Sequence, residues 1–167
     1  MKKYLVIGNP IEHSLSPELH NYWIKNRKIN AIYEKMKITN DEIKDVILQI
    51  KNGKINGLNI TVPFKQEVIP HLDQLSEEAD KTQSVNTIFF ENDKVVGHNT
   101  DIAGFEYSLK FNKINLKNKN IFIIGAGGVV PSIICALNKM QVSNITISNR
   151  TKNKAENLKK LFENLKI

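Results

Sequence analysis

Four short polar clusters hold the residues of this sequence that are best suited to chemistry. They supply hydroxyl groups, amides, one lysine and one carboxylate, and they lie at the ends of predicted strands. The clusters are SLSP at 14–17, NITVPFK at 59–65, SVNT at 84–87 and GHNTD at 97–101. Ligands of open α/β sheets collect at such strand ends. Together these groups fit a small acid that carries several hydroxyl groups.

The same residues also have structural interpretations when their spacing is considered alone. Lys65 could be an exposed lysine at the start of a helix, and Asp101 could serve only as a helix N-cap. Ser16 precedes Pro17 at a predicted helix start, where we expect it to act as the N-cap. Ser16 could also combine this capping role with ligand binding.

A glycine-rich turn lies between a predicted strand and a predicted helix in the second half of the chain. Gly125 and Gly127 occupy the first two glycine positions of the dinucleotide-binding fingerprint, and Val130 occupies the third. Such a turn lets backbone N–H groups at a helix N-terminus contact a pyrophosphate. The alternative is an ordinary tight turn between a strand and a helix in any α/β sheet.

The end of the following strand carries basic and polar residues. An NAD site places an acidic residue about 20 residues beyond the glycines, to bind the ribose hydroxyls. Here the chain has Ser148, Asn149, Arg150 and Thr151, followed by Lys154. A guanidinium donates two parallel hydrogen bonds to a phosphate and remains charged. This segment therefore predicts a 2′-phosphate site and NADP, the alternative being a solvated basic helix start.

Hydrophobic periodicity and turn residues predict an α/β protein with two domains. A lysine- and asparagine-rich stretch separates them, and we place the boundary near residue 103, giving domains 1–103 and 104–167 with the helix 101–111 as the connector. The second domain contains one βαβα module. The predicted strands are 4–8, 31–38, 57–62, a hairpin over 84–99, 120–124 and 144–149; the predicted helices are 17–27, 41–53, one or two within 64–82, 101–111, 129–140 and 151–166.

Composition excludes several other classes of protein. The 167 residues are 41% hydrophobic and 25% charged, which is ordinary for a globular protein, and no apolar run is long enough to span a membrane. We therefore expect a cytoplasmic location. The single cysteine, Cys135, is expected in the core, and the histidines have no metal-site spacing. The formal charge of +7 suits an anionic partner, but the lysines form no nucleic-acid-reading motif.

The four polar clusters, followed in order by GAGG and NRT, closely resemble the shikimate dehydrogenase family over essentially the whole chain. The resemblance implies an N-terminal α/β substrate domain followed by the first half of a Rossmann-type NADP-binding domain. It also implies reversible reduction of 3-dehydroshikimate to shikimate with NADPH, on the way to chorismate and aromatic amino acids.

The resemblance also assigns site residues. Ser14 and Ser16 would bind the substrate carboxylate, and Thr61, Asn86 and Asp101 would contact the ring hydroxyls. Lys65 matches the catalytic lysine. The pyrophosphate would lie against Gly125, Ala126, Gly127, Gly128 and Val129, and the adenosine 2′-phosphate against Asn149, Arg150, Thr151 and Lys154.

The chemistry of ketone reduction explains the roles of the two ionisable residues in this assignment. Hydride transfer leaves negative charge on the ketone oxygen, which needs a proton donor beside it. Lys65 is expected to donate this proton, because a lysine ammonium is protonated at neutral pH. Asp101 is expected mainly to orient Lys65 and a substrate hydroxyl, with a share in proton transfer left open.

The length of the chain differs from the family pattern. A doubly wound sheet of this kind has about six strands, and only two are predicted after residue 119. We therefore expect a C-terminally incomplete family member. The alternatives are a non-catalytic shikimate-binding protein and an enzyme of broader specificity that also accepts quinate; association into a homodimer is left open.

Overall fold

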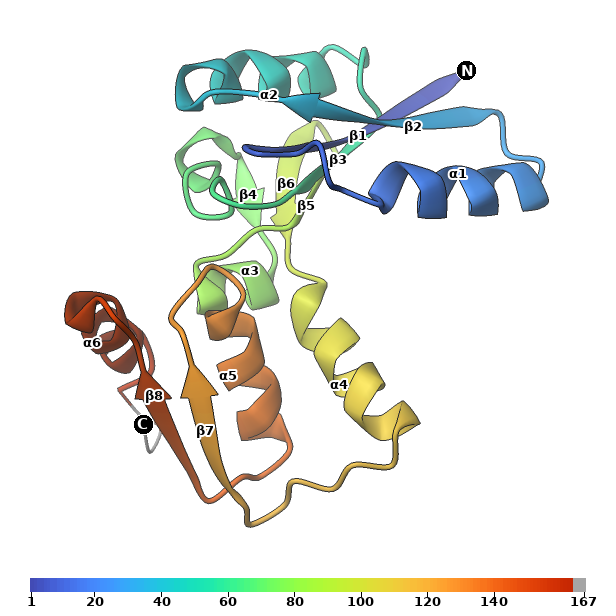
Figure 1. Ribbon diagram of the computed structural model, residues 1–167. Coiled ribbons are helices and arrows are strands. Elements are labelled where there is room, and N and C mark those ends of the chain that lie inside the picture. The colour runs from blue at the N-terminus through green and yellow to red at the C-terminus, as the bar shows by residue number, and fades with distance from the viewer. Residues whose placement is uncertain (164–167) are drawn as a thin grey trace. The chain divides into compact units, whose positions relative to one another are not determined.

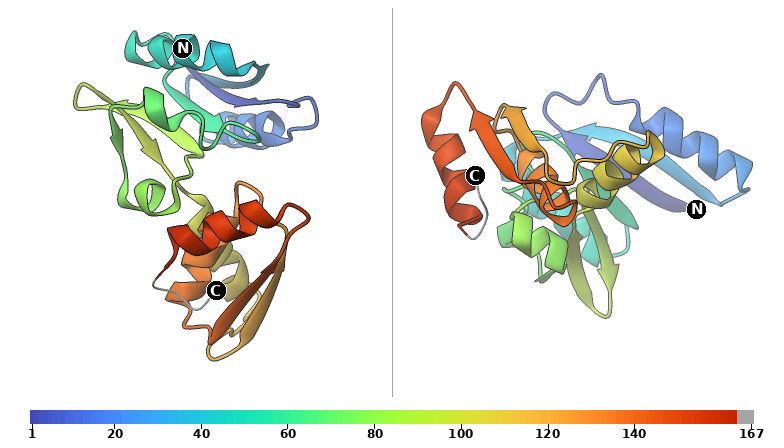
Figure 2. Two further views of the ribbon diagram at one scale, coloured as in Figure 1. Left: turned by 90° about the vertical axis from the view of Figure 1, so that its left-hand side faces the viewer. Right: turned by 90° about the horizontal axis from the view of Figure 1, so that it is seen from below.

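The computed structural model of the chain describes residues 1–163, and the end of the helix predicted over 151–166 lies outside this range. The chain forms two compact units, the first over Met1–Asn99 and the second beginning at Thr100 (Figures 1 and 2). The boundary predicted near residue 103 lies within the first turn of a helix of the second unit. The buried side chain of Ile102 packs in the core of that unit.

The first unit is built on a six-stranded mixed sheet with the order β2-β1-β3-β5-β6-β4. Strand β1 runs parallel to both β2 and β3, β5 runs antiparallel to β3 and β6, and β4 runs parallel to β6. The carboxyl ends of β1, β3 and β6 therefore share one edge with the start of β5. The strands are β1 (Lys2–Gly8), β2 (Ala31–Lys37), β3 (Gly57–Ile60), β4 (Gln74–Leu75), β5 (Thr87–Glu91) and β6 (Lys94–His98).

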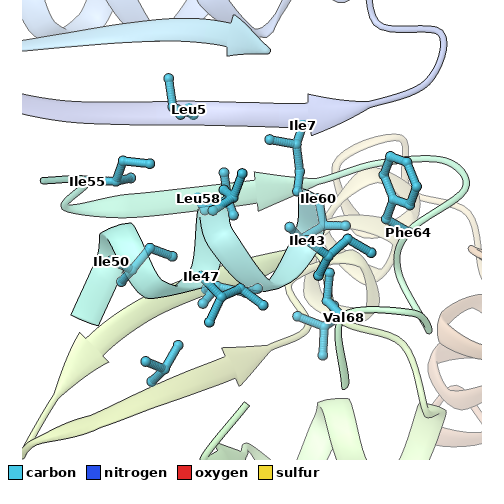
Figure 3. Packing of buried hydrophobic residues seen from close by; sticks show 14 of the residues in the cluster. Leu5, Ile7, Ile43, Ile47, Ile50, Ile55, Leu58, Ile60, Phe64 and Val68 are labelled. Carbon is cyan, nitrogen blue, oxygen red and sulfur yellow. The ribbon is translucent and has the colours of Figure 1, made fainter. Parts of the chain in front are cut away.

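Helices cover both faces of this sheet, because its central strands are apolar on both sides. Leu5 and Ile7 of β1 pack with helix α2 (Ile43–Lys51), whereas Val6 packs with Tyr33 and with Ile24 of α1 (Ser16–Asn26) on the other face (Figure 1). Figure 3 shows the α2 side, where isoleucines of the helix meet the strand side chains. Helix α2 buries Ile43, Val46, Ile47 and Ile50, the spacing of one helical face.

The segment 64–82, for which one or two short helices are predicted, also contains an unpredicted strand. It contains a 3₁₀ turn η2 (Ile69–His71), the two-residue strand β4 and only one short α-helix, α3 (Glu77–Thr82). Strand β4 forms because Gln74 and Leu75 pair with Val96 and Gly97 of β6. This pairing depends on residues distant in sequence, so no local pattern indicates it. A further 3₁₀ turn, η1 (Asn40–Glu42), precedes α2.

Helix α1 also begins differently from the prediction. Ser16 is the first residue of the helix, the N-cap position is taken by Leu15, and no side-chain capping bond forms there. The expectation that Ser16 is the N-cap is therefore wrong. Pro17 does lie in the first turn, where its missing N–H removes no intrahelical bond.

The second unit is the predicted βαβα module preceded by one helix. Its strands pair in parallel with Ile121 opposite Ile145, and residues from all three helices share one core. Cys135 is buried in this core, as predicted. The elements are α4 (Asp101–Phe111), β7 (Asn120–Ile124), α5 (Val130–Lys139), β8 (Asn144–Ser148) and α6 (Lys152–Leu161).

The predicted α/β class is confirmed. The hairpin of β5 and β6 turns at Asn92 and Asp93, both of which have positive φ angles.

Within residues 1–163, no helix combines the length and the apolar character needed to cross a bilayer.

The first prediction concerns two neighbouring side chains of α2. Ile50 is 1% exposed and Leu48 is 51% exposed. We expect Ile50→Ala to lower the free energy of unfolding by about 2–5 kcal/mol, because it leaves a cavity in the core. Leu48→Ala, the matched control, should change it by no more than about 0.5 kcal/mol. Denaturant titration of both variants measures the difference, and equal losses would contradict this account of the core.

Candidate functional site

Segments of three predicted polar clusters, those around Thr61, Asn86 and His98, meet at one edge of the sheet of the first unit. The Thr61 N–H donates to the Ile7 carbonyl at 2.9 Å, which joins the ends of β3 and β1. The Asn86 carbonyl accepts from the Ile60 N–H at 2.9 Å, and the Asn86 N–H donates to the His98 carbonyl at 3.1 Å. Thr61 and Asn86 are therefore held on neighbouring segments of the chain.

Lys65 is held at the same edge by its backbone. The Val85 N–H donates to the Lys65 carbonyl at 2.8 Å, and the turn before Lys65 is closed by a bond from the Phe64 N–H to the Thr61 carbonyl. Phe64 and Val68 are buried in the core on either side of Lys65. The half-buried side chain of Lys65 therefore starts from a fixed backbone position that lies next to the segment carrying Asn86.

Close approach of two strands at this edge requires a glycine. A Cβ atom on Gly8 would lie 2.5 Å from Thr61 Cγ2, 3.0 Å from Ile11 Cδ1 and 3.1 Å from the Val62 carbonyl oxygen. A methyl group there would displace Thr61. Gly8 thus lets β1 end directly beside a predicted ligand residue.

Ser14 lies in the loop before α1 and Ser16 is the first residue of that helix, and Glu12 ties the loop to β2. The Glu12 carboxylate accepts from the Ile11 N–H at 2.9 Å and from Lys37 Nζ at 3.1 Å. Its own backbone N–H, Lys37 and the Ile11 N–H together lower the pKa of Glu12 to about 2. At the end of this loop, the Ser14 hydroxyl accepts a long bond from the Ser16 N–H at 3.4 Å.

A chain of side-chain hydrogen bonds connects Ser16 with Asn86 across the sheet. Tyr33 contacts the Ser16 side chain, and its hydroxyl donates to Asn59 Oδ1 at 2.7 Å. Asn59 Nδ2 donates to Thr87 Oγ1 at 3.1 Å, and Thr87 Oγ1 donates to Asn86 Oδ1 at 3.0 Å. Burial raises the pKa of Tyr33 to about 12, although its hydrogen bond with Ser16 acts in the opposite direction.

The sequence patterns indicated no role for Tyr33 or Asn59. Asn59 lies inside the NITVPFK cluster, so the motif could have indicated it. Tyr33 belongs to an alternating strand pattern and becomes part of the chain only through contacts with other strands. Its ring stacks on His20, with centroids 4.2 Å apart and an interplanar angle of 5°, and burial lowers the pKa of His20.

Asp101 is the first residue of α4 and belongs to the second unit. Thr100 holds the N-cap position without a side-chain capping bond, and the Asp101 side chain is partly buried. An acidic residue in the first turn of a helix interacts favourably with the helix dipole. The pairing of Asp101 with Lys65 across the two units stays a prediction.

The glycine turn of the second unit has the backbone that the fingerprint requires. Gly125 has φ +111°, which side-chain-bearing residues rarely adopt, and its N–H donates to the Ser148 carbonyl at 2.7 Å. At Gly127, no heavy atom lies within 4 Å of the position that a Cβ would take. Helix α5 starts at Val130. A pyrophosphate fits this turn, since it needs both close backbone approach and a helix N-terminus.

The end of β8 presents the predicted basic residues. Asn149 Nδ2 donates to the Thr151 carbonyl at 2.8 Å and thereby shapes the turn into α6. Arg150, Thr151 and Lys154 are exposed, and the segment 148–154 contains no carboxylate. These donors fit a phosphate and offer no acidic partner for a free ribose hydroxyl pair. In residues 1–163 there is no group of three or more His, Cys, Asp or Glu side chains that could hold a metal ion.

Two family models match the chain. The shikimate dehydrogenase substrate binding domain matches residues 6–88, and the shikimate / quinate 5-dehydrogenase model matches residues 108–167. The first match contains Ser14, Ser16, Thr61, Lys65 and Asn86, and the second contains the glycine turn and the basic segment.

Named relatives agree with these models. The shikimate dehydrogenase (NADP(+)) of Pelagibacter ubique is 59% identical over 99% of this chain and 63% of its own length. The crystal structure of the Aquifex aeolicus shikimate dehydrogenase superposes with a TM-score of 0.91 at 42% identity, over 98% of this chain and 61% of that one. A Thermus thermophilus shikimate 5-dehydrogenase in complex with NADP(H) and shikimate gives 0.87 at 30% identity, over 98% of this chain and 61% of that one.

The second prediction tests the burial of Tyr33 through the ionisation of its hydroxyl. The ultraviolet absorbance of tyrosinate should show a component that titrates near pH 12. Tyr33→Phe should remove that component, and Tyr22→Phe, at an exposed site of the same unit, should leave it. Because the folded protein holds this proton more tightly than the unfolded chain, the associated stability is complete below pH 10 and is lost toward pH 12. If Tyr33→Phe removed a component that titrates at lower pH and left the one near pH 12, the assignment of the latter to Tyr33 would be wrong.

Proposed function

The chain belongs to the shikimate dehydrogenase family, and from this premise we propose that it contributes to the NADP-dependent interconversion of 3-dehydroshikimate and shikimate. The observation that carries the proposal is the sheet edge of the first unit, where backbone hydrogen bonds bring together the segments bearing Thr61, Lys65 and Asn86. The chain spans about 60% of the length of its relatives. That it has the activity of those longer proteins is therefore proposed.

In the proposed substrate site, the carboxylate and the ring hydroxyls of the substrate contact different side chains. Ser14 and Ser16 would bind the carboxylate, since the hydroxyls and backbone N–H groups of this loop are hydrogen-bond donors. Thr61 and Asn86 would bind ring hydroxyls, and Asp101 would accept from another. The Thermus thermophilus structure that contains shikimate supports this ligand class.

In the proposed reaction, Lys65 holds the proton that the ketone oxygen of 3-dehydroshikimate receives. When bound, NADPH would supply the hydride. The developing oxyanion is stabilised by the Lys65 ammonium, and Asp101 would orient that ammonium and a substrate hydroxyl. In the reverse direction, the Lys65 amine would take the hydroxyl proton of shikimate as the hydride leaves the ring carbon for bound NADP⁺.

The second unit would hold the cofactor by its backbone and its basic segment. The N–H groups of the turn 125–129 would bind the pyrophosphate, including those of Ala126, Gly128 and Val129. Arg150 would bind the 2′-phosphate through paired hydrogen bonds, aided by Asn149, Thr151 and Lys154. Acceptance of quinate, a homodimer and a cytoplasmic location stay predictions.

The third prediction tests the catalytic lysine. We expect Lys65→Ala to lower kcat for shikimate oxidation by about 10²- to 10⁴-fold, as removal of a general acid–base group does. The dissociation constant for shikimate should change much less. Lys51→Ala, at an exposed lysine of α2, is the control and should change neither quantity.

The measurements for this prediction are the rate of NADPH formation and a calorimetric titration with shikimate. Near-normal turnover in Lys65→Ala would remove Lys65 from the proposed role. Shikimate binding by the wild-type chain without NADPH formation would favour the alternative of a non-catalytic shikimate-binding protein.

The fourth prediction concerns cofactor choice. Arg150→Ala should weaken binding of adenosine 2′,5′-bisphosphate about tenfold, the loss expected for a charge-assisted hydrogen-bonding partner. Binding of AMP, which lacks the 2′-phosphate, should change little. Lys160→Ala on the exposed side of α6 is the control, and titration calorimetry measures all three proteins. Equal weakening of both nucleotides by Arg150→Ala would contradict a 2′-phosphate role.

A further inference from the structure

We propose that Asn99 is a positioning residue of the substrate site, and that its buried side chain fixes the segment 84–86 and thereby Asn86. The inference rests on the proposed function, in which Asn86 contacts a ring hydroxyl of the substrate. Asn99 lies in the GHNTD cluster, where Asp101 has been given a role and Asn99 has not. It ends the first unit, directly after strand β6.

The Asn99 side chain donates hydrogen bonds to two acceptors, one on each side of a short turn. Its Nδ2 atom donates to the Ser84 carbonyl at 2.8 Å and to Thr82 Oγ1 at 3.2 Å. Asn99 is 1% exposed, and both Thr82 and Ser84 are fully buried. A buried polar group that loses its hydrogen-bond partner cannot replace it with water, which is energetically unfavourable. These two bonds therefore keep Thr82 and Ser84 in fixed positions relative to Asn99.

The turn between the two acceptors has a backbone conformation that requires support. Gln83 lies between Thr82 and Ser84 and has φ 47° and ψ 43°, in the left-handed region that is unfavourable for a residue with a side chain. Asn99 binds the residue on each side of Gln83. Thr82 is the last residue of α3, and its hydroxyl donates within that helix to the Glu78 carbonyl at 2.6 Å.

This turn leads directly into the residues that join the site together. After the bond from Asn99 to Ser84, the Val85 N–H donates to the Lys65 carbonyl at 2.8 Å and the Asn86 N–H donates to the His98 carbonyl at 3.1 Å. Three consecutive residues are thus bonded to Asn99, Lys65 and His98. The peptide unit that accepts from Asn99 also donates to the Lys65 carbonyl, and the next peptide unit carries the Asn86 N–H. Removal of the Asn99 side chain should therefore disturb the positions of both Asn86 and the Lys65 backbone.

Only an amide fits the role that this geometry assigns. Both bonds use N–H groups of Nδ2, and a carboxylate has no N–H to donate to a carbonyl. Asn99→Asp would place acceptors opposite the Ser84 carbonyl, and Asn99→Ala would leave both acceptors without this donor. Thr82→Val keeps the side-chain shape and leaves the bond from Asn99 to Ser84 in place, but it removes one acceptor of Asn99 together with the hydroxyl's bond to the Glu78 carbonyl. It is the milder perturbation in case Asn99→Ala folds poorly.

The test measures both the segment and the ligand in the complete chain. Amide hydrogen exchange of Val85 and Asn86 is followed by NMR, and shikimate binding by calorimetry, for the wild type, Asn99→Ala and Thr82→Val. The control is Asn56→Ala, because the Asn56 side chain also bridges distant backbone segments, accepting from the Lys3 N–H at 2.9 Å. Asn99→Ala is also combined with Asn86→Ala in a double-mutant cycle.

We expect Asn99→Ala to speed exchange at Val85 and Asn86 and to weaken shikimate binding, each by about tenfold, and Thr82→Val to do so by less. In the Asn86→Ala background, Asn99→Ala should weaken binding much less than in the wild type. Asn56→Ala should leave both quantities unchanged.

Unchanged exchange at Val85 and Asn86 in Asn99→Ala would overturn the inference, and so would an equal loss of affinity in both backgrounds of the cycle. These outcomes differ from failure of the proposed function. If the wild-type chain does not bind shikimate, the proposed function is wrong, and the exchange measurements still decide whether Asn99 fixes the segment 84–86.

Discussion

The candidate site depends on a few backbone hydrogen bonds between strand ends of the first unit. The bonds from Thr61 to Ile7, from Ile60 to Asn86 and from Asn86 to His98 join segments far apart in sequence. The apolar core of the first unit, in which Ile60 and Ile88 are almost fully buried, excludes water from the neighbouring ladder bonds. Backbone bonds are stronger in such surroundings, so the apolar core indirectly fixes the polar edge.

The side chains at this edge are organised by two separate polar networks. One runs over the sheet from Ser16 through Tyr33 and Asn59 to Asn86, and the other joins Asn99 to the turn before Asn86. The first network therefore fixes the side chain of Asn86, and the second fixes its backbone. Preorganisation of this kind lowers the entropy that ligand binding must otherwise remove.

The second unit uses a different physical principle to prepare its site. Its glycine turn contributes backbone N–H groups and space, and the end of β8 contributes positive charge. The selectivity for a phosphate over a hydroxyl pair that we propose for this segment would follow from charge and would require no deep pocket. The basic side chains can accordingly remain exposed, whereas Asn99 of the first unit makes its bonds in a buried position.

Local sequence patterns determined the α/β class, most elements, the glycine turn and the basic segment after β8, because these depend on periodicity, turn residues and residue type. Only the tertiary structure decided the strand β4, the start of α1 at Ser16, and the inclusion of Asp101 in the second unit. It also decided the partners of Tyr33, Asn59 and Asn99. Apart from the start of α1, each of these features is a contact between residues distant in the chain, and the energy of such a contact appears only when the strands are paired and the core excludes water.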